Sequence, residues 1–168
     1  STPPRGCRGT CSRPPRDGLE GVSEMHPGNY IYNDVMQLRI CSIDSVRDIA
    51  PRVVTRVIGH YPQHATLLID CGWTGCSAQG ATRGYGLIEG HPELAIKVLK
   101  QEAGEVEVAL DADGTSVSEE QMRTRYPIGT LLSIVPWHAC AATAMHRTVY
   151  ATDERGVIVG EYAIARGW

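Results

Sequence analysis

Short aliphatic runs bounded by glycine, proline and aspartate constrain the fold of this 168-residue chain more than any other feature. Residues 52–58, 65–69, 105–110 and 131–135 are such runs, and residues 29–36 alternate and are rich in tyrosine, so we expect a strand in each. Residues 148–151 and 157–165 predict a closing hairpin around the turn 153–156. Many short strands of this kind favour a mainly β fold, a small β-barrel or sandwich with one or two short helices.

Two segments predict those helices. Residues 92–101 carry four aliphatic side chains between Pro92 and Gly104, which fits one short helix. Ser118 followed by Gln121 matches a capping box and predicts a single helical turn. Lys97 and Lys100, the only two lysines, would lie on the first helix in ion pairs with Glu93 and Glu102, so neither is typical of a Schiff-base lysine.

The composition excludes several classes of protein. With 16 basic and 19 acidic residues the net charge is −3, and no basic stripe interleaves with aromatic residues, so nucleic acid is not an expected partner. No apolar run is long enough to span a membrane, and the first residues lack the charged region followed by an apolar stretch that is typical of a signal peptide, so we expect a cytoplasmic protein. The six scattered cysteines favour reduced thiols, and Cys7 and Cys11 form only an incomplete zinc motif.

The first residues differ in composition from the rest. Residues 1–21 are rich in Pro, Gly and Arg and have almost no large apolar side chain, so we expect a loop. The chain starts without methionine at Ser1-Thr2-Pro3-Pro4, which suggests that another segment precedes it.

His138 and Cys140 are the most specific local feature, because they follow an apolar strand directly. On an extended backbone, side chains two positions apart share one face at roughly 6 to 7 Å between Cα atoms. Imidazole and thiolate are preferred zinc donors, although a zinc site needs three or four ligands. A buried cysteine beside a hydrogen-bonded core histidine is the alternative. His146 shares the even spacing, but an ordinary surface histidine explains it as well.

Two further positions have roles that the residues alone do not decide. The turn at Pro27-Gly28 before Asn29 lets backbone N–H groups approach an anion, or it is an ordinary turn. Asp70 follows an apolar strand, where its carboxylate either orients a ligand or accepts hydrogen bonds from the turn.

Seven stretches together resemble the family of D-serine dehydratase and D-threonine aldolase, whose members join an alanine-racemase-like barrel to a C-terminal β-domain. In chain order they are Ser1-Thr2-Pro3, Pro27-Gly28-Asn29-Tyr30-Ile31-Tyr32, Leu68-Ile69-Asp70-Cys71-Gly72, Gly84-Tyr85-Gly86, Gly90-His91-Pro92-Glu93-Leu94, Gln101-Glu102-x-Gly104 and Pro136-x-His138-x-Cys140. The chain departs from the family at Trp137, usually Asn, and at Ala103, often His.

The resemblance implies a pyridoxal 5'-phosphate enzyme that also uses zinc, with His138 and Cys140 as the zinc ligands and Thr2, Gly28 and Asn29 in the cofactor phosphate cup. The H-x-C pair resembles the dehydratase branch, which converts D-serine to pyruvate and ammonia. By the same resemblance, residues 1–28 are a tail and loop from the end of a (β/α)8 barrel and residues 29–168 are the C-terminal zinc-binding β-domain.

The family's catalytic lysine precedes Ser1, so the resemblance places no catalytic residue in this chain and implies that it is inactive alone. Its expected partners are the barrel, a D-amino acid substrate and a second copy in a homodimer. A D-threonine aldolase-like lyase and a non-catalytic, stand-alone metal-binding β-module remain alternatives. The roles of Asp70, Tyr85 and Glu102 stay open.

Overall fold

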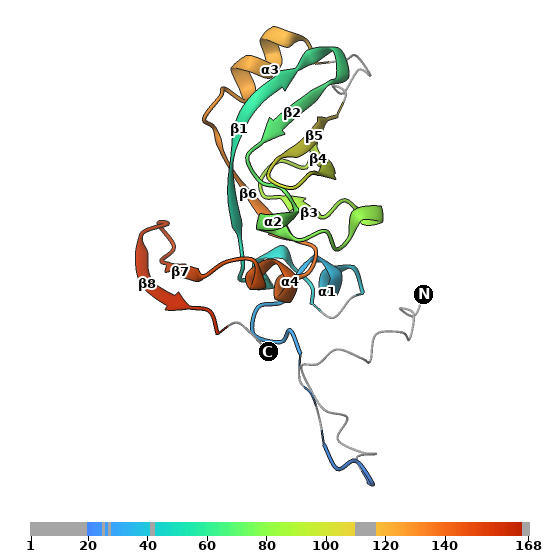
Figure 1. Ribbon diagram of the computed structural model, residues 1–168, viewed down its shortest axis with the longest axis vertical. Coiled ribbons are helices and arrows are strands. Elements are labelled where there is room, and N and C mark those ends of the chain that lie inside the picture. The colour runs from blue at the N-terminus through green and yellow to red at the C-terminus, as the bar shows by residue number, and fades with distance from the viewer. Residues whose placement is uncertain (1–19, 25, 27, 41–42, 110–116, 166–168) are drawn as a thin grey trace.

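A six-stranded antiparallel sheet, curved into a nearly closed barrel, forms the body of the molecule (Figure 1). The computed structural model describes residues 20–24, 26, 28–40, 43–109 and 117–165. The strands are β1 (Val53–Tyr61), β2 (Thr66–Ile69), β3 (Gly86–Ile88), β4 (Leu94–Leu99), β5 (Gly104–Val108) and β6 (Leu131–Pro136). Their order is β3-β6-β1-β2-β5-β4, and β3 and β4, at the two edges, contact each other. The predicted mainly β fold is confirmed.

Alternation of buried and exposed side chains fills the barrel. In β1 every second residue from Val53 to Val57 is buried, and Ile69, Val106 and Ile134 from neighbouring strands are fully buried in the same core. This is the period of two that a half-buried strand requires. The barrel therefore encloses one continuous apolar core.

The helices in the described residues are short. They are α1 (Val35–Arg39), α2 (Trp73–Cys76), α3 (Glu119–Arg125) and α4 (Ala139–Ala144), with 3₁₀ turns at Val46–Asp48, Pro62–His64 and Ala81–Arg83. The predicted capping box starts α3: Gln121 N donates to Ser118 Oγ (3.2 Å) and Ser118 N to Gln121 Oε1 (2.8 Å). None of these helices is long and apolar enough to cross a membrane.

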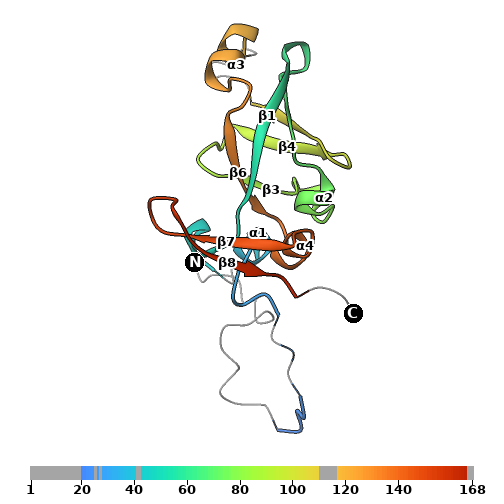
Figure 2. The ribbon, with the colours of Figure 1, turned by 60° about the vertical axis from the view of Figure 1, so that its left-hand side comes forward.

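The predicted closing hairpin is also confirmed. It consists of β7 (Thr148–Thr152) and β8 (Ile158–Ala163), paired antiparallel, with the Asp153 carboxylate accepting backbone N–H groups at the turn. Figures 1 and 2 both place it at the end of the barrel where α1 and α4 lie, opposite α3. Its exposed large apolar side chains are Tyr150, Val157, Ile158, Val159 and Tyr162.

The structure also corrects several sequence predictions. Residues 92–101 do not form a helix, because Leu94 and Ile96 alternate with exposed Ala95 and Lys97 in strand β4 and pair with β5. Lys97 and Lys100 accordingly form ion pairs across the sheet with Glu107 and Glu105, not with Glu93 and Glu102.

Residues 29–36 do not form a strand either. A turn at residues 29–33 leads into α1, which begins after the N-cap Asp34. Helix α1 and the 3₁₀ turn that follows bring Val35 and Ile49 against Val135 of β6, forming a second apolar cluster. Met36 N donates to Trp137 O (3.1 Å), so α1 is fixed to the end of β6.

Candidate metal centre and its surroundings

The corner between β6 and α4 carries the predicted metal ligands. Strand β6 ends at Pro136, and His138 keeps an extended backbone (φ −134°, ψ 111°) as the N-cap residue of α4. Residues Ala139–Ala144 are mostly alanine, which has the highest helix propensity, and the helix starts as soon as the sheet ends.

Cys140 lies in the first turn of α4, so the expectation that it continues an extended strand was wrong. The pair therefore does not share a face through the strand period of two. Neither side chain belongs to the apolar core, however: the His138 side chain is 22% exposed and Cys140 is an exposed free thiol. The alternative of a cysteine buried in the core does not describe Cys140.

Asp34 connects this corner to α1, and the sequence prediction did not identify it. Its side chain is fully buried and accepts from His138 Nδ1 (2.9 Å) and Ala139 N (2.9 Å) at Oδ2 and from Gln37 N (3.0 Å) at Oδ1. Asn29 Nδ2 donates to Oδ2 as well. A buried carboxylate needs such donors to offset its desolvation. With Nδ1 engaged, the Nε2 atom of His138 is the ring nitrogen left for a ligand.

The turn before α1 brings a second predicted segment to the same corner. Tyr30 N donates to Gly28 O (2.9 Å) and Asn33 N to Asn29 O (3.0 Å). A Cβ at Gly28 would meet only open space. The Oδ1 atom of Asn29 is buried and has no hydrogen-bond partner in the described part of the chain. Asn29 and His138 thus bond to the same carboxylate, that of Asp34. Thr2 lies outside the described residues.

The protein itself offers few metal ligands here. Among the residues that the structure describes, no group of three or more His, Cys, Asp or Glu side chains could hold a metal ion. His138 and Cys140 are therefore at most part of a zinc coordination sphere, which has four positions in most proteins.

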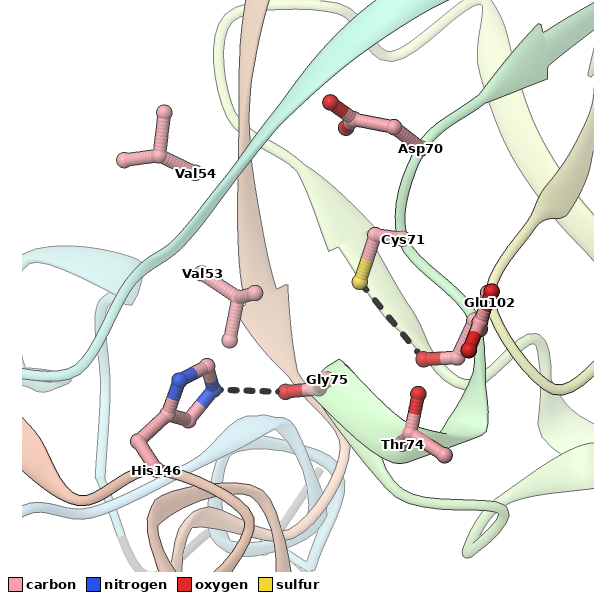
Figure 3. A pocket seen from close by; sticks show the side chains of 9 residues that line it. Val53, Val54, Asp70, Cys71, Thr74, Gly75, Glu102 and His146 are labelled. Carbon is pink, nitrogen blue, oxygen red and sulfur yellow. Dashed lines mark hydrogen bonds between the residues drawn. The ribbon is translucent and has the colours of Figure 1, made fainter.

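A separate hollow of about 250 Å³ lies between β1, α2 and the segment after α4 (Figure 3). Its polar lining includes Asp70, Thr74, Glu102 and His146, but neither His138 nor Cys140. Asp70 Oδ1 accepts from Thr55 Oγ1 (2.7 Å) and from Arg56 N (2.7 Å). Both donors belong to β1 and not to the turn, so these bonds fix the end of β2 against β1 and leave the ligand-orienting role of Asp70 open.

His146 lies at the edge of this hollow and joins α4 to α2, because its Nε2 atom bonds the carbonyl of Gly75 (2.7 Å), as Figure 3 shows. Cys71 and Cys76 are both buried beside it. A hydrogen bond between the two thiols lowers the pKa of Cys71, and the same bond together with burial raises the pKa of Cys76. These two cysteines are packing residues at the ends of α2.

The remaining family-like motifs stabilise the loops. Tyr85 adopts a left-handed backbone (φ 57°), and its carbonyl accepts from Trp137 N (2.8 Å), next to His138. Glu93, in the Gly90–Leu94 motif, accepts hydrogen bonds from Tyr126 and His91. Desolvation alone would raise the pKa of Glu93, but these hydrogen bonds outweigh it, so the pKa lies below its ordinary value.

Comparison with known proteins gives one family. The family model described as "Putative serine dehydratase domain" matches residues 50–152. The D-threo-3-hydroxyaspartate dehydratase of Delftia sp. HT23 is 33% identical over 151 residues, which cover 83% of this chain and 38% of that enzyme. The D-serine dehydratase of Dictyostelium discoideum is 27% identical in an alignment 171 residues long, gaps included. This alignment covers 94% of this chain and 41% of that enzyme. The chain thus spans about two fifths of the length of these relatives.

The solved structure of the Delftia enzyme superposes with a TM-score of 0.74 at 30% identity, covering 89% of this chain and 41% of that one. The same enzyme has been solved with alanine in place of a histidine. It has also been solved, in a metal-free form, with alanine in place of a cysteine two positions further on. This is the spacing of His138 and Cys140.

Proposed function

Because the chain belongs to the serine dehydratase domain family, we propose that it is the zinc-binding part of a pyridoxal-phosphate-dependent D-serine dehydratase, which forms pyruvate and ammonia. The observation that carries the proposal is the arrangement at His138. Its Nδ1 atom is hydrogen-bonded to the buried carboxylate of Asp34, and the exposed thiol of Cys140 follows two residues later. A histidine and a cysteine at the same spacing in the Delftia enzyme, the latter replaced in a metal-free form, support it.

Zinc fits this corner by its chemistry. Imidazole nitrogen and thiolate sulfur are the donors that zinc prefers, and a zinc-bound histidine usually donates its other ring N–H to a carboxylate. His138 and Asp34 supply that pair. His138 and Cys140 would hold the ion, and the positions they leave open are available to water or substrate, as in catalytic zinc sites.

Pyridoxal phosphate fits the chain only through its phosphate. The open space beside Gly28 allows a phosphate oxygen to approach the backbone of the turn, and Asn29 has its side chain at the same corner. Thr2 is proposed as a third contact from the resemblance alone. Neither lysine offers a Schiff base, because Lys97 and Lys100 form ion pairs with Glu107 and Glu105 of β5, so the Schiff-base lysine belongs to the proposed (β/α)8 barrel.

When bound, zinc would supply Lewis-acid chemistry for loss of a β-hydroxyl, and the coenzyme would supply an electron sink for charge at the α-carbon. The residues of this chain would bind and orient: His138 and Cys140 would hold the ion, Asp34 holds the imidazole, and the turn at Gly28 would hold the phosphate. The chain alone is therefore expected to be inactive. Its proposed partners are the (β/α)8 barrel that carries the Schiff-base lysine and a second subunit.

D-threo-3-hydroxyaspartate is a second candidate substrate, favoured by the similarity to the Delftia enzyme. It carries the same β-hydroxyl, with a carboxylate in addition. The aldolase alternative would instead yield glycine and acetaldehyde from D-threonine.

Metal binding tests the site directly. Co²⁺ is titrated into the chain, and absorption bands from thiolate coordination are recorded for the wild type and for His138→Ala and Cys140→Ser. We expect the bands in the wild type and in the control His64→Ala, a histidine at the end of a 3₁₀ turn on another part of the barrel, and their loss in both site variants. Equal binding by all four proteins would refute the site.

Activity tests the substrate. The chain is joined to the preceding three fifths of the Delftia enzyme and supplied with pyridoxal phosphate and zinc. Pyruvate from D-serine, lost in Cys140→Ser, supports the dehydratase. Oxaloacetate from D-threo-3-hydroxyaspartate without pyruvate from D-serine indicates the second substrate, and glycine from D-threonine the aldolase.

A further inference from the structure

The buried carboxylate of Asp34 joins two parts of the proposed site that are far apart in the sequence, the turn at Asn29 and the corner at His138. We propose that Asp34 is a positioning residue, which fixes the His138 imidazole in its Nδ1–H tautomer and holds the Asn29 turn against the start of α4. The inference rests on the proposed function, in which Nε2 is the atom that faces zinc. Asp34 touches neither the coenzyme nor the substrate in this proposal.

The donors around Asp34 determine the tautomer. A carboxylate offers only acceptors, and Oδ2 already accepts the Ala139 N–H, so the His138 Nδ1 atom at 2.9 Å must carry the hydrogen. Free histidine favours the opposite tautomer, with the hydrogen on Nε2. The full burial of Asp34 removes the competition of water for these bonds. Asp34 thus leaves the lone pair of Nε2 available without any metal being present.

Asn29 is tied to the same oxygen atom. Its Nδ2 atom donates to Asp34 Oδ2, and its Oδ1 atom is buried with no partner among the described residues. A movement of the turn that carries Gly28 would therefore reach His138 through Asp34. Asp34 and His138 are 104 positions apart in the sequence. The phosphate turn and the metal ligand are held in one arrangement by a single side chain.

Two substitutions separate this positioning role from helix capping. Asp34→Ser keeps a good N-cap acceptor for α1, because serine caps helices as well as aspartate, but the shorter side chain does not reach His138. Asp34→Asn retains three of the four bonds when its amide nitrogen replaces Oδ1, the atom whose one side-chain bond within the described part of the chain is from Gln37 N. In that orientation Asn gives up the N-cap bond and keeps the bond to His138, whereas Ser keeps the N-cap bond and gives up the bond to His138. A capping role alone would therefore be satisfied by Ser, and positioning of His138 by Asn.

The tautomer is read from the ¹⁵N shifts of the imidazole in the metal-free, ¹⁵N-histidine-labelled chain, with His138 assigned by its absence in His138→Ala. We expect Nδ1–H in the wild type and in Asp34→Asn, and a shift toward Nε2–H in Asp34→Ser. Ser118→Ala, which removes the cap of α3, is the matched control and should leave the His138 signals unchanged. Circular dichroism confirms that each variant is folded.

Nε2–H in the wild type would overturn the proposal, and so would Nδ1–H retained in folded Asp34→Ser. Co²⁺ titration adds the affinity: Asp34→Ser is expected to bind about 10 to 100 times more weakly than the wild type, the usual effect of removing such a partner. A wild type that binds no Co²⁺ refutes the proposed zinc site while the tautomer measurement still decides the role of Asp34. The two failures are therefore distinguishable.

Discussion

Gly72 is the position at which one added methyl group should damage the fold most clearly. It is the N-cap residue of α2 and lies against the turn between β4 and β5. A Cβ at this position would overlap the backbone carbonyls of Lys100 and Gln101 at distances that real Cβ atoms do not show. Because the obstacle is backbone on both sides, no side-chain rotation relieves it.

The expected cost of Gly72→Ala follows from these contacts. Overpacking of this kind costs about 1–3 kcal/mol. Separating α2 from the turn also stretches the bonds from Trp73 N to Lys100 O (2.8 Å), from Thr74 N to Gln101 O (3.2 Å) and from Thr74 Oγ1 to Gln101 O (2.6 Å). Each such bond contributes about 0.5–1.5 kcal/mol, so a loss of about 3 kcal/mol or more is expected.

Urea unfolding followed by circular dichroism measures this loss, and a thermal scan should show Tm lower by about 6–12 °C. Gly28→Ala is the matched control, because its Cβ meets open space and its φ is not in the left-handed region. It should lie within about 0.5 kcal/mol of the wild type. A Gly72→Ala variant as stable as this control would show that the packing of α2 on the β4–β5 turn is not as described.

Three further predictions concern charge, thiols and local stability. The Arg52 guanidinium, by hydrogen bonding, holds the pKa of Glu89 below its ordinary value of 4.5, so the stabilisation is present above about pH 4.5 and is lost as the pH falls through the lower folded-state pKa. Glu89→Gln should therefore lower the urea midpoint at neutral pH and flatten its decline in acid, and an unchanged decline would contradict this. Brief alkylation followed by peptide mapping should label Cys140 in the folded chain, and should label Cys71 and Cys76 only after unfolding. Labelling of Cys71 and Cys76 as fast as Cys140 in the folded chain would contradict their burial. Amide hydrogens of β7 and β8, whose side chains are largely exposed, should exchange faster than those of β1 and β2, and equal protection would show that the hairpin is as stable as the barrel.

Local patterns predicted most of the strands but not the assignment of residues 92–101. Over so short a run, Leu94, Ile96, Val98 and Leu99 include spacings of two, typical of a strand, and spacings of three and four, typical of a helix. Pro92 and Gly104 are also typical helix boundaries. The pairing with β5 decides between them, since it buries Leu94 and Ile96 and joins Lys97 to Glu107. That partner is not encoded in the local pattern.

The candidate site shows the same limit. The spacing of His138 and Cys140 drew attention to the corner between β6 and α4, but the argument from an extended strand was wrong, because the alanine-rich segment starts a helix at Ala139. Asp34 had a local signal, an N-cap residue before an apolar run, which tyrosine-rich alternation obscured. Its bond to His138 spans 104 positions and could not be inferred from one sequence.

The barrel and the proposed site differ in how they are held together. The barrel core is large and continuous, whereas α1 has five residues and packs on a cluster with only three buried members, Val35, Ile49 and Val135. A helix of this length has little stability of its own, so its position depends on Met36 N bonding to Trp137 O and on the bonds of Asp34. A ligand bound at His138 would favour the state in which those bonds are made and stabilise it by mass action. Order in α1 and occupancy of the proposed zinc site are therefore expected to be coupled.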